Sequence, residues 1–174
     1  ARVSCGVEGG QVAAPLMARP PGTGEGHLTT AQQLPLTGAV IVSTPQDVAL
    51  MDAGKALAMF QTLNVPILGI VENMTSFICP HCHTETQIFG HGGAHAAAQR
   101  LGVPFLGEIP LTLEIRTGSD SGRPITVDAP ESGEAVAFRK VAKDLAAQVS
   151  ILAYRQQEAN MRGPGAPLPL FRRR

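Results

Sequence analysis

The chain has 174 residues, with 14 acidic and 14 basic side chains, no tryptophan and only 4% aromatic residues. This balance excludes a surface built throughout for nucleic acid, and no run approaches the roughly twenty apolar residues of a membrane span. We therefore expect no nucleic-acid partner and no stable membrane insertion. The three cysteines, one of them isolated at Cys5, do not make a disulfide framework and indicate a reducing compartment.

The chain divides into three predicted parts: an atypical N-terminal segment (1–19), an α/β domain (20–150) and a disordered basic tail (151–174). The first part is rich in Gly and Ala without a clear period, and it begins at Ala1 rather than at a methionine. We interpret that start as a processed product or a fragment. The tail contains several Gly and Pro residues and ends in three arginines, so contact with nucleic acid or a membrane is a minor alternative there.

Pro20 to Gly24 read Pro-Pro-Gly-Thr-Gly. The glycines permit a close approach of the backbone to a phosphate, and Thr23 adds a hydroxyl. This signal is weak by itself. The phosphate-cradling pattern G-x-x-x-x-G-K-S/T does not occur, since Gly54-Lys55 lacks the earlier glycine and is followed by Ala56.

Three short, mostly continuous apolar runs are typical of parallel strands that are buried on both faces: 39–42, 67–71 and 104–109. A helix is predicted after the first run, because Thr44 offers a capping hydroxyl and Pro45 suits the first helical position. The side of this helix that faces the sheet is predicted to carry Leu50, Ala53, Leu57 and Phe60. The helix is predicted to end at 64–66. Further helices are predicted at 93–101 and 134–149, the second with an apolar stripe of Phe138, Val141 and Leu145.

Cys79-Pro80-His81-Cys82 places two thiols three positions apart, so both can bind one metal centre from a single turn. Thiolates favour zinc, copper(I) and iron-sulfur centres, and one pair supplies half of a four-ligand site. The other half can come from the same pair on a second copy or from nearby histidines. A zinc knuckle, a thioredoxin-like redox pair and two unrelated buried thiols are the alternatives that the spacing leaves open. The histidines are His81, His83, His91 and His95.

Ligands of a doubly wound sheet bind beyond the carboxyl ends of its strands. Three such places follow the predicted strands: 43–47, 72–74 and 109–111. The first can be a plain helix cap. The Asn73 amide can donate and accept at once, which suits the edge of a purine base, and a turn-forming asparagine is the alternative.

Taken together, these motifs resemble the Mrp/ApbC/Nbp family of iron-sulfur cluster carrier P-loop ATPases, including its mitochondrial branch. The resemblance runs from Pro20 to about Val149, and an ENM triplet followed closely by CPxC is specific to the family. The motifs are PPGTG (20–24), GAVIVSTPQDVALMDA (38–53), VPILGIVENMTSFICPHC (65–82), IFGHGG (88–93), LGVPFLGEIPL (101–111) and SDSGRPI (119–125).

The resemblance implies the C-terminal part of a doubly wound, mainly parallel sheet of the P-loop NTPase type (SIMIBI, ParA/MinD-like). It implies a carrier, a homodimer or related hetero-oligomer, that shares a 4Fe-4S cluster between subunits and hands it to apo iron-sulfur proteins. ATP and Mg would control the exchange, in a bacterial cytoplasm or, alternatively, a mitochondrial matrix. By position, the cluster ligands would be Cys79 and Cys82, and the nucleotide-binding residues Gly22, Thr23, Gly24, Asn73 and Pro110.

The chain also departs from the family pattern. A P-loop of the GKGGVGKS type is missing, Ala18 stands where relatives have an aspartate, and Glu25 and Thr112 replace other usual acids. We therefore expect an incomplete sheet with exposed apolar faces and, although relatives are ATPases, no ATP hydrolysis by this chain alone; no catalytic residue is assigned. A zinc-stabilised interaction module and a partitioning-type nucleotide-dependent regulator are the alternative functions.

Overall fold

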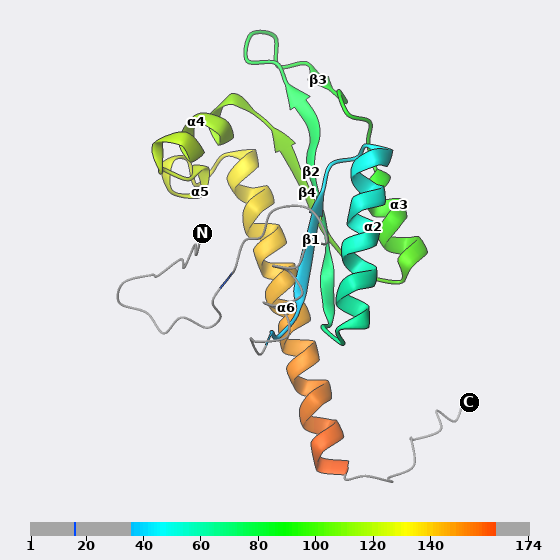
Figure 1. Ribbon diagram of the computed structural model, residues 1–174. Coiled ribbons are helices and arrows are strands. Elements are labelled where there is room, and N and C mark those ends of the chain that lie inside the picture. Colours follow the sequence, from blue (N-terminus) through cyan, green and yellow to red (C-terminus); the bar gives the residue numbers. More distant parts are fainter. Residues whose placement is uncertain (1–15, 17–35, 163–174) are drawn as a thin grey trace, which may run out of the picture.

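Three parallel strands form the centre of the molecule in the computed structural model, which describes Leu16 and residues 36–162 (Figure 1). The predicted phosphate segment around Thr23 lies outside the described residues. The described elements, in chain order, are β1 (Ala39–Ser43), α2 (Asp47–Thr62), β2 (Ile67–Ile78), β3 (Glu85–Thr86), α3 (Gly93–Leu101), β4 (Phe105–Leu111), α4 (Leu113–Ser121), α5 (Ile125–Asp128) and α6 (Gly133–Arg162).

β2 is the middle strand of the sheet. It pairs in parallel with β1 on one edge and with β4 on the other, while the short β3 pairs antiparallel with its last residues. The three predicted strands are therefore confirmed. β2 continues past Val71 as far as Ile78, because its later residues still pair with β4 and β3.

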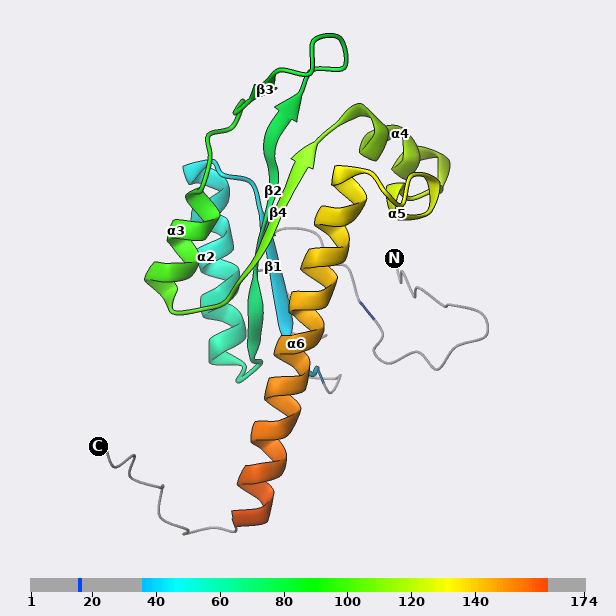
Figure 2. The ribbon, with the colours of Figure 1, turned by 180° about the vertical axis from the view of Figure 1, so that it is seen from behind.

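Helices cover both faces of this sheet, as the doubly wound expectation requires. α2 and α3 lie on one face and α6 crosses the other, as the front and back views agree (Figures 1 and 2). Each face buries its own apolar cluster, and the predicted stripes of α2 and α6 face the sheet. The first cluster centres on Ile41, Leu57, Ile70, Ala94 and Ala98, with Leu50 and Ala53 packed against it; the second centres on Val71, Leu106 and Ile109, with Phe138, Val141 and Leu145 packed against it.

The predicted start of α2 is wrong in its detail. The helix begins at Asp47 with Gln46 as its N-cap, and no side chain caps it. The Thr44 hydroxyl instead lies 3.5 Å from the Gln46 side-chain oxygen. Pro45 is buried, and its carbonyl oxygen lies so close to Gly93 that a side chain there would collide with it. Pro45 thus packs against the start of α3 and does not occupy the first turn of α2.

α6 is longer than predicted. It continues without a break from Gly133 to Arg162, so the tail expected from residue 151 does not begin there. Residues 150–162 contain no Gly or Pro and consist mostly of good helix formers, and the first breaker pair is Gly163-Pro164. The remaining residues of that tail lie outside the described residues. None of the described helices is long and apolar enough to cross a membrane.

β1 is less completely covered than β2. Its Val42 side chain is 61% exposed, and within the described residues β1 pairs only with β2. A parallel strand normally has helices on both faces, and it has a neighbouring strand on each side unless it is the edge strand of the sheet. The exposed valine therefore agrees with the expectation of an incomplete sheet.

A buried carboxylate joins the middle strand to α3. Glu72 is completely buried, and its two oxygens accept hydrogen bonds from the backbone N–H groups of Gly92 (3.0 Å) and Ala94 (2.7 Å). These amides belong to the first turn of the helix, which is also the positive end of its dipole. Gly92 has a left-handed backbone with φ of 74°, a conformation that glycine adopts without strain. The carboxylate thus holds the start of α3 against β2.

Glu72→Gln should lower the free energy of unfolding by about 2–4 kcal/mol. The substitution removes the charge and turns an amide group toward a backbone donor, so one charge-assisted hydrogen bond and part of the dipole interaction are lost. Urea unfolding in the presence of a chelator measures the change. Glu131→Gln, at an exposed position, is the matched control and should stay within about 0.5 kcal/mol of the parent chain. Equal stability of the two variants would contradict the structural role of Glu72.

Candidate functional site

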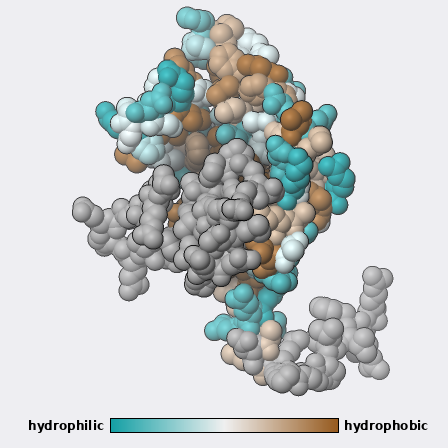
Figure 3. Space-filling view, in the orientation of Figure 1, coloured by the Kyte–Doolittle hydropathy of each residue, from teal (hydrophilic) through white to brown (hydrophobic). Residues whose placement is uncertain are grey.

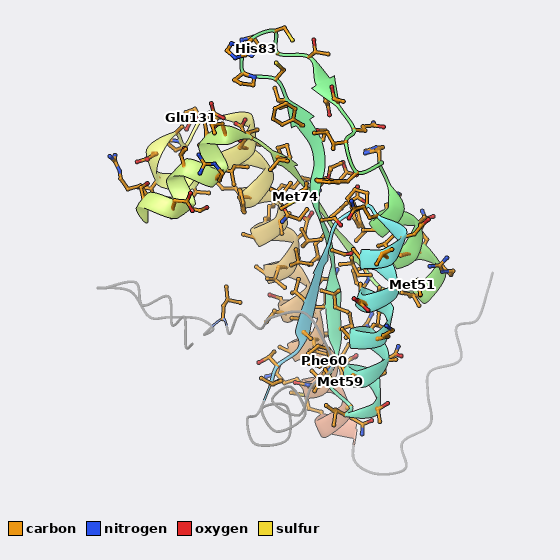
Figure 4. The ribbon with its side chains drawn as sticks, turned by 45° about the horizontal axis from the view of Figure 1, so that its top comes forward. Met51, Met59, Phe60, Met74, His83 and Glu131 are labelled. Carbon is orange, nitrogen blue, oxygen red and sulfur yellow. The ribbon has the colours of Figure 1, made fainter. Side chains whose placement is uncertain are left out.

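The two predicted metal ligands lie at the end of a hairpin that projects beyond the helices (Figure 1). β2 ends at Ile78, and the chain turns through residues 79–84 before β3 returns beside it. The turn is closed by backbone hydrogen bonds from the Cys79 N–H to the Thr84 carbonyl (3.1 Å) and from the His83 N–H to the Cys79 carbonyl (2.9 Å). His83 is left-handed with φ of 56°, and Figure 4 shows it at the tip of the hairpin.

Both thiols of this turn are free and accessible. Cys79 is half-buried and Cys82 is exposed. On the face seen in Figure 3 the tip carries both hydrophilic and hydrophobic residues, with more hydrophobic residues beneath it. A partner, a metal centre or an oxidant can therefore reach the sulfur atoms without rearrangement of the core.

The surroundings of Cys82 favour its thiolate. Its Sγ lies 3.2 Å from the Thr84 hydroxyl. Hydrogen bonds from the Thr84 side chain, from the Thr84 backbone and from the Cys79 side chain lower the pKa of the Cys82 thiol below its ordinary value. Donors of this kind stabilise the negative charge on sulfur, and the thiolate is the form that binds a metal. Thr84 contributes to the candidate site, and sequence reasoning missed it.

The nearby histidines do not complete a zinc site with the two cysteines. His81 and His83 are exposed on the turn, whereas the His95 ring lies over Phe105 with centroids 4.8 Å apart. Among the described residues, no group of three or more potential ligands includes a cysteine; the group that does occur consists of Glu72, His91 and Glu108. The geometry therefore gives the Cys-His alternative no support.

The three places predicted just after the strands lie side by side, but 72–74 and 109–111 belong to β2 and β4 themselves, because both strands continue further than predicted. Ser43 of β1 pairs with Glu72 of β2, and Asn73 pairs with Ile109 of β4, next to the half-buried Pro110. Asn73 and Pro110 therefore lie on neighbouring strands, the first on the middle strand β2 and the second on β4. The two glycines and the threonine predicted beside them, Gly22, Thr23 and Gly24, lie outside the described residues.

The Asn73 side chain also has a local role. Its Oδ1 accepts a hydrogen bond from the Met74 N–H at 3.0 Å. Met74 is left-handed with φ of 58°, and the pairing of β2 with β4 shifts register between Asn73 and Phe77. These features are typical of a bulge that redirects a strand. The Nδ2 donor group of Asn73 is not used in this turn.

Sequence analysis also missed the contact of Glu72 with the start of α3. An acid inside an apolar strand is itself a signal of a buried partner. Lys55, the lysine of the rejected phosphate-loop match, pairs with Asp52 on the surface of α2 at 2.9 Å. The structure agrees with that rejection.

The family described as ParA: NUBPL iron-transfer P-loop NTPase matches residues 7–146 of the chain. The match begins ahead of Pro20, which corrects the starting point that the motifs gave. The iron-sulfur cluster transfer protein NUBPL of Dictyostelium discoideum is 53% identical over 133 residues. These residues make up 76% of this chain and 41% of that protein, so the chain spans less than half of the relative.

Solved structures show the same fold. A nucleotide-binding protein from Archaeoglobus fulgidus, solved in complex with ADP, superposes with a TM-score of 0.55 and 42% identity, over 65% of this chain and 45% of that one. The cell division ATPase MinD of Pyrococcus furiosus gives a TM-score of 0.51 and 28% identity, over 63% and 42% of the two chains. The predicted fold class, part of a ParA/MinD-like P-loop NTPase sheet, is confirmed.

The two free cysteines at the hairpin tip, the family match and the similar solved structures all indicate the same family. The chain belongs to the Mrp/NUBPL family of iron-sulfur cluster carrier P-loop NTPases.

Proposed function

We propose that the chain carries a 4Fe-4S cluster as cargo between two subunits and hands it to apo iron-sulfur proteins. The observation that supports this proposal most strongly is the pair of accessible thiols, Cys79 and Cys82, on one hydrogen-bonded turn. The three cysteines predict a reducing compartment, either a bacterial cytoplasm or a mitochondrial matrix.

The number of ligands argues for a shared site. A cubane cluster held by cysteines takes four thiolates, and one hairpin tip offers two. A two-fold symmetric pair of chains presents the same turn twice, so it completes the ligand set without any further residue. The projection of the tip beyond the helices leaves room for a second copy to approach it (Figure 1).

The turn also suits cargo that must be released. Cys82 is exposed, so a recipient thiol can reach the ligand that holds the cluster. The hydrogen bonds that stabilise its thiolate stay within the turn, between Cys82 and Thr84. Arrival and departure of the cluster therefore do not require the helices that cover the sheet to move.

Nucleotide control is the second part of the proposal. Asn73 and Pro110 would contact the adenine side of ATP, and Gly22, Thr23 and Gly24 would lie near its terminal phosphate with Mg. The pairing of β2 with β4, in which Asn73 lies opposite the residue before Pro110, supports the proposed contacts of Asn73 and Pro110. β2 then runs directly from Asn73 to the turn of Cys79, so one continuous strand connects the two proposed sites.

Anaerobic reconstitution with iron and sulfide should load about two iron atoms per chain, because four are shared by two chains. A broad visible absorption band should accompany the iron. Cys79→Ser or Cys82→Ser should abolish both signals, whereas Cys5→Ser, the matched control, should retain them. Tight, stoichiometric zinc in a monomer that does not respond to iron would instead support the zinc-stabilised module.

Asn73→Ala should weaken ATP binding about ten- to a hundredfold in a chimera that supplies the P-loop part of a relative, because a hydrogen bond to the base is lost. Calorimetry measures the affinity, and cluster loading should stay unchanged. Asn73→Asp is the informative control, since it keeps the oxygen that binds the Met74 N–H but lacks the amide donor. Normal affinity in the Asp variant would assign Asn73 to the turn alone.

The chain as given should not release phosphate from ATP above background. Phosphoryl transfer needs backbone amides and a lysine around the β- and γ-phosphates, and these 174 residues contain no G-x-x-x-x-G-K-S/T loop. Phosphate release is measured before and after a relative's P-loop segment is joined in cis, which should restore it. Turnover by the unmodified chain at an ordinary enzymatic rate, abolished by a substitution within it, would refute this expectation.

A further inference from the structure

The side chains of Glu72, His91 and Glu108 form a group that belongs neither to the proposed iron-sulfur site nor to the proposed nucleotide site. They come from β2, from the segment just before α3 and from β4. Their ligand atoms, one imidazole nitrogen and two carboxylate oxygens, all lie within 4.8 Å of one another. Three segments that are far apart in the sequence thus bring three potential metal ligands to one place.

The backbone fixes this arrangement. Glu72 and Glu108 are paired residues of adjacent parallel strands, so they lie at the same level of the sheet. Glu72 is completely buried and binds the amides of Gly92 and Ala94, which places His91, the residue before them, beside the two acids. His91 and Glu108 are exposed, so their side chains are free to adjust.

The cluster carries unbalanced charge. Two carboxylates on neighbouring strands repel each other, and the helix amides offset only the charge of Glu72. The ion pairs found among the described residues, those of Lys55, Arg116, Arg123 and Lys140, all involve other acids. A bound cation would supply the positive charge that the described neighbourhood does not.

We propose that Glu72, His91 and Glu108 bind a divalent transition-metal cation. A mixed set of one imidazole and two carboxylates suits ions such as Zn²⁺, Fe²⁺ and Mn²⁺, with water in the remaining positions. A carboxylate has about four lone-pair sites, and the amides occupy two of those on Glu72, which leaves room for the ion.

The required adjustment is small. Ligand bonds of about 2.0–2.2 Å in a tetrahedral site separate neighbouring ligand atoms by ~3.4 Å. His91 and Glu108 are exposed, so their side chains can rotate to bring their ligand atoms closer to the buried Glu72 oxygen. The ion would join β2, β4 and the start of α3, directly beside Asn73, and it would be separate from the thiols of the hairpin tip.

The test uses the full chain with Cys5, Cys79 and Cys82 all changed to Ser, so that no thiolate competes for the metal. Calorimetric titration with Zn²⁺ should give one ion per chain, and Co²⁺ should give visible absorption without a thiolate-to-cobalt charge-transfer band. His91→Ala and Glu108→Gln should each weaken binding by about tenfold or more, since the loss of even an outer-shell partner costs that much. His95→Ala, an exposed histidine on α3, is the matched control and should bind normally.

Thermal unfolding provides a second readout. Zn²⁺ should raise the unfolding midpoint of the cysteine-free chain and of His95→Ala relative to chelator, and it should leave His91→Ala unchanged. Either of two results would overturn the proposal: no Zn²⁺ binding to the cysteine-free chain at about millimolar metal, or equal binding by the His91→Ala and Glu108→Gln variants. Neither result would affect the assignment of the cluster ligands, because the thiols are absent throughout.

Discussion

The position of β2 is the constraint on which the rest of the structure depends. This strand has a parallel partner on each edge and helices over both faces, so most of its residues from Leu68 to Ser76 are buried. A buried charge inside it needs hydrogen-bond partners, and each carboxylate oxygen of Glu72 accepts one hydrogen bond from a backbone amide at the start of α3. The strand and the helix therefore hold each other in place.

Each proposed site has at least one residue on this strand or directly after it. Asn73 follows Glu72 directly, and the pairing of β2 with β4 shifts register after Asn73. The turn that carries Cys79 and Cys82 begins directly after Ile78, the last residue of β2. An extended strand rises about 3.3 Å per residue, so Asn73 and Cys79 are at most roughly 20 Å apart along a strand that the left-handed Met74 interrupts. Such a connection suits a carrier whose cargo is handled at a distance from the nucleotide.

The sequence predicted the features that depend on local pattern. Continuous apolar runs located the parallel strands, and the helix predicted at 93–101 is α3, whose bounds are Gly93–Leu101. Features that depend on tertiary contact were missed. Pro45, predicted at the first position of α2, instead packs against Gly93, and the partners of Glu72 lie 20 and 22 residues further along the chain. No spacing rule identifies such partners from one sequence.

The length of α6 shows a different limit. Its apolar stripe at Phe138, Val141 and Leu145 packs on the sheet as predicted, but the helix continues to Arg162 past the end of that stripe. The residues beyond the stripe are mostly good helix formers, whereas the prediction relied on apolar spacing.

The most direct test of the central claim is native mass spectrometry of the anaerobically reconstituted chain. The account predicts a species with the mass of two chains and one 4Fe-4S cluster, which separates into single chains when the cluster is removed by a chelator. A single chain that retains a complete cluster or one zinc ion, with no cluster-dependent dimer at any protein concentration, would contradict it.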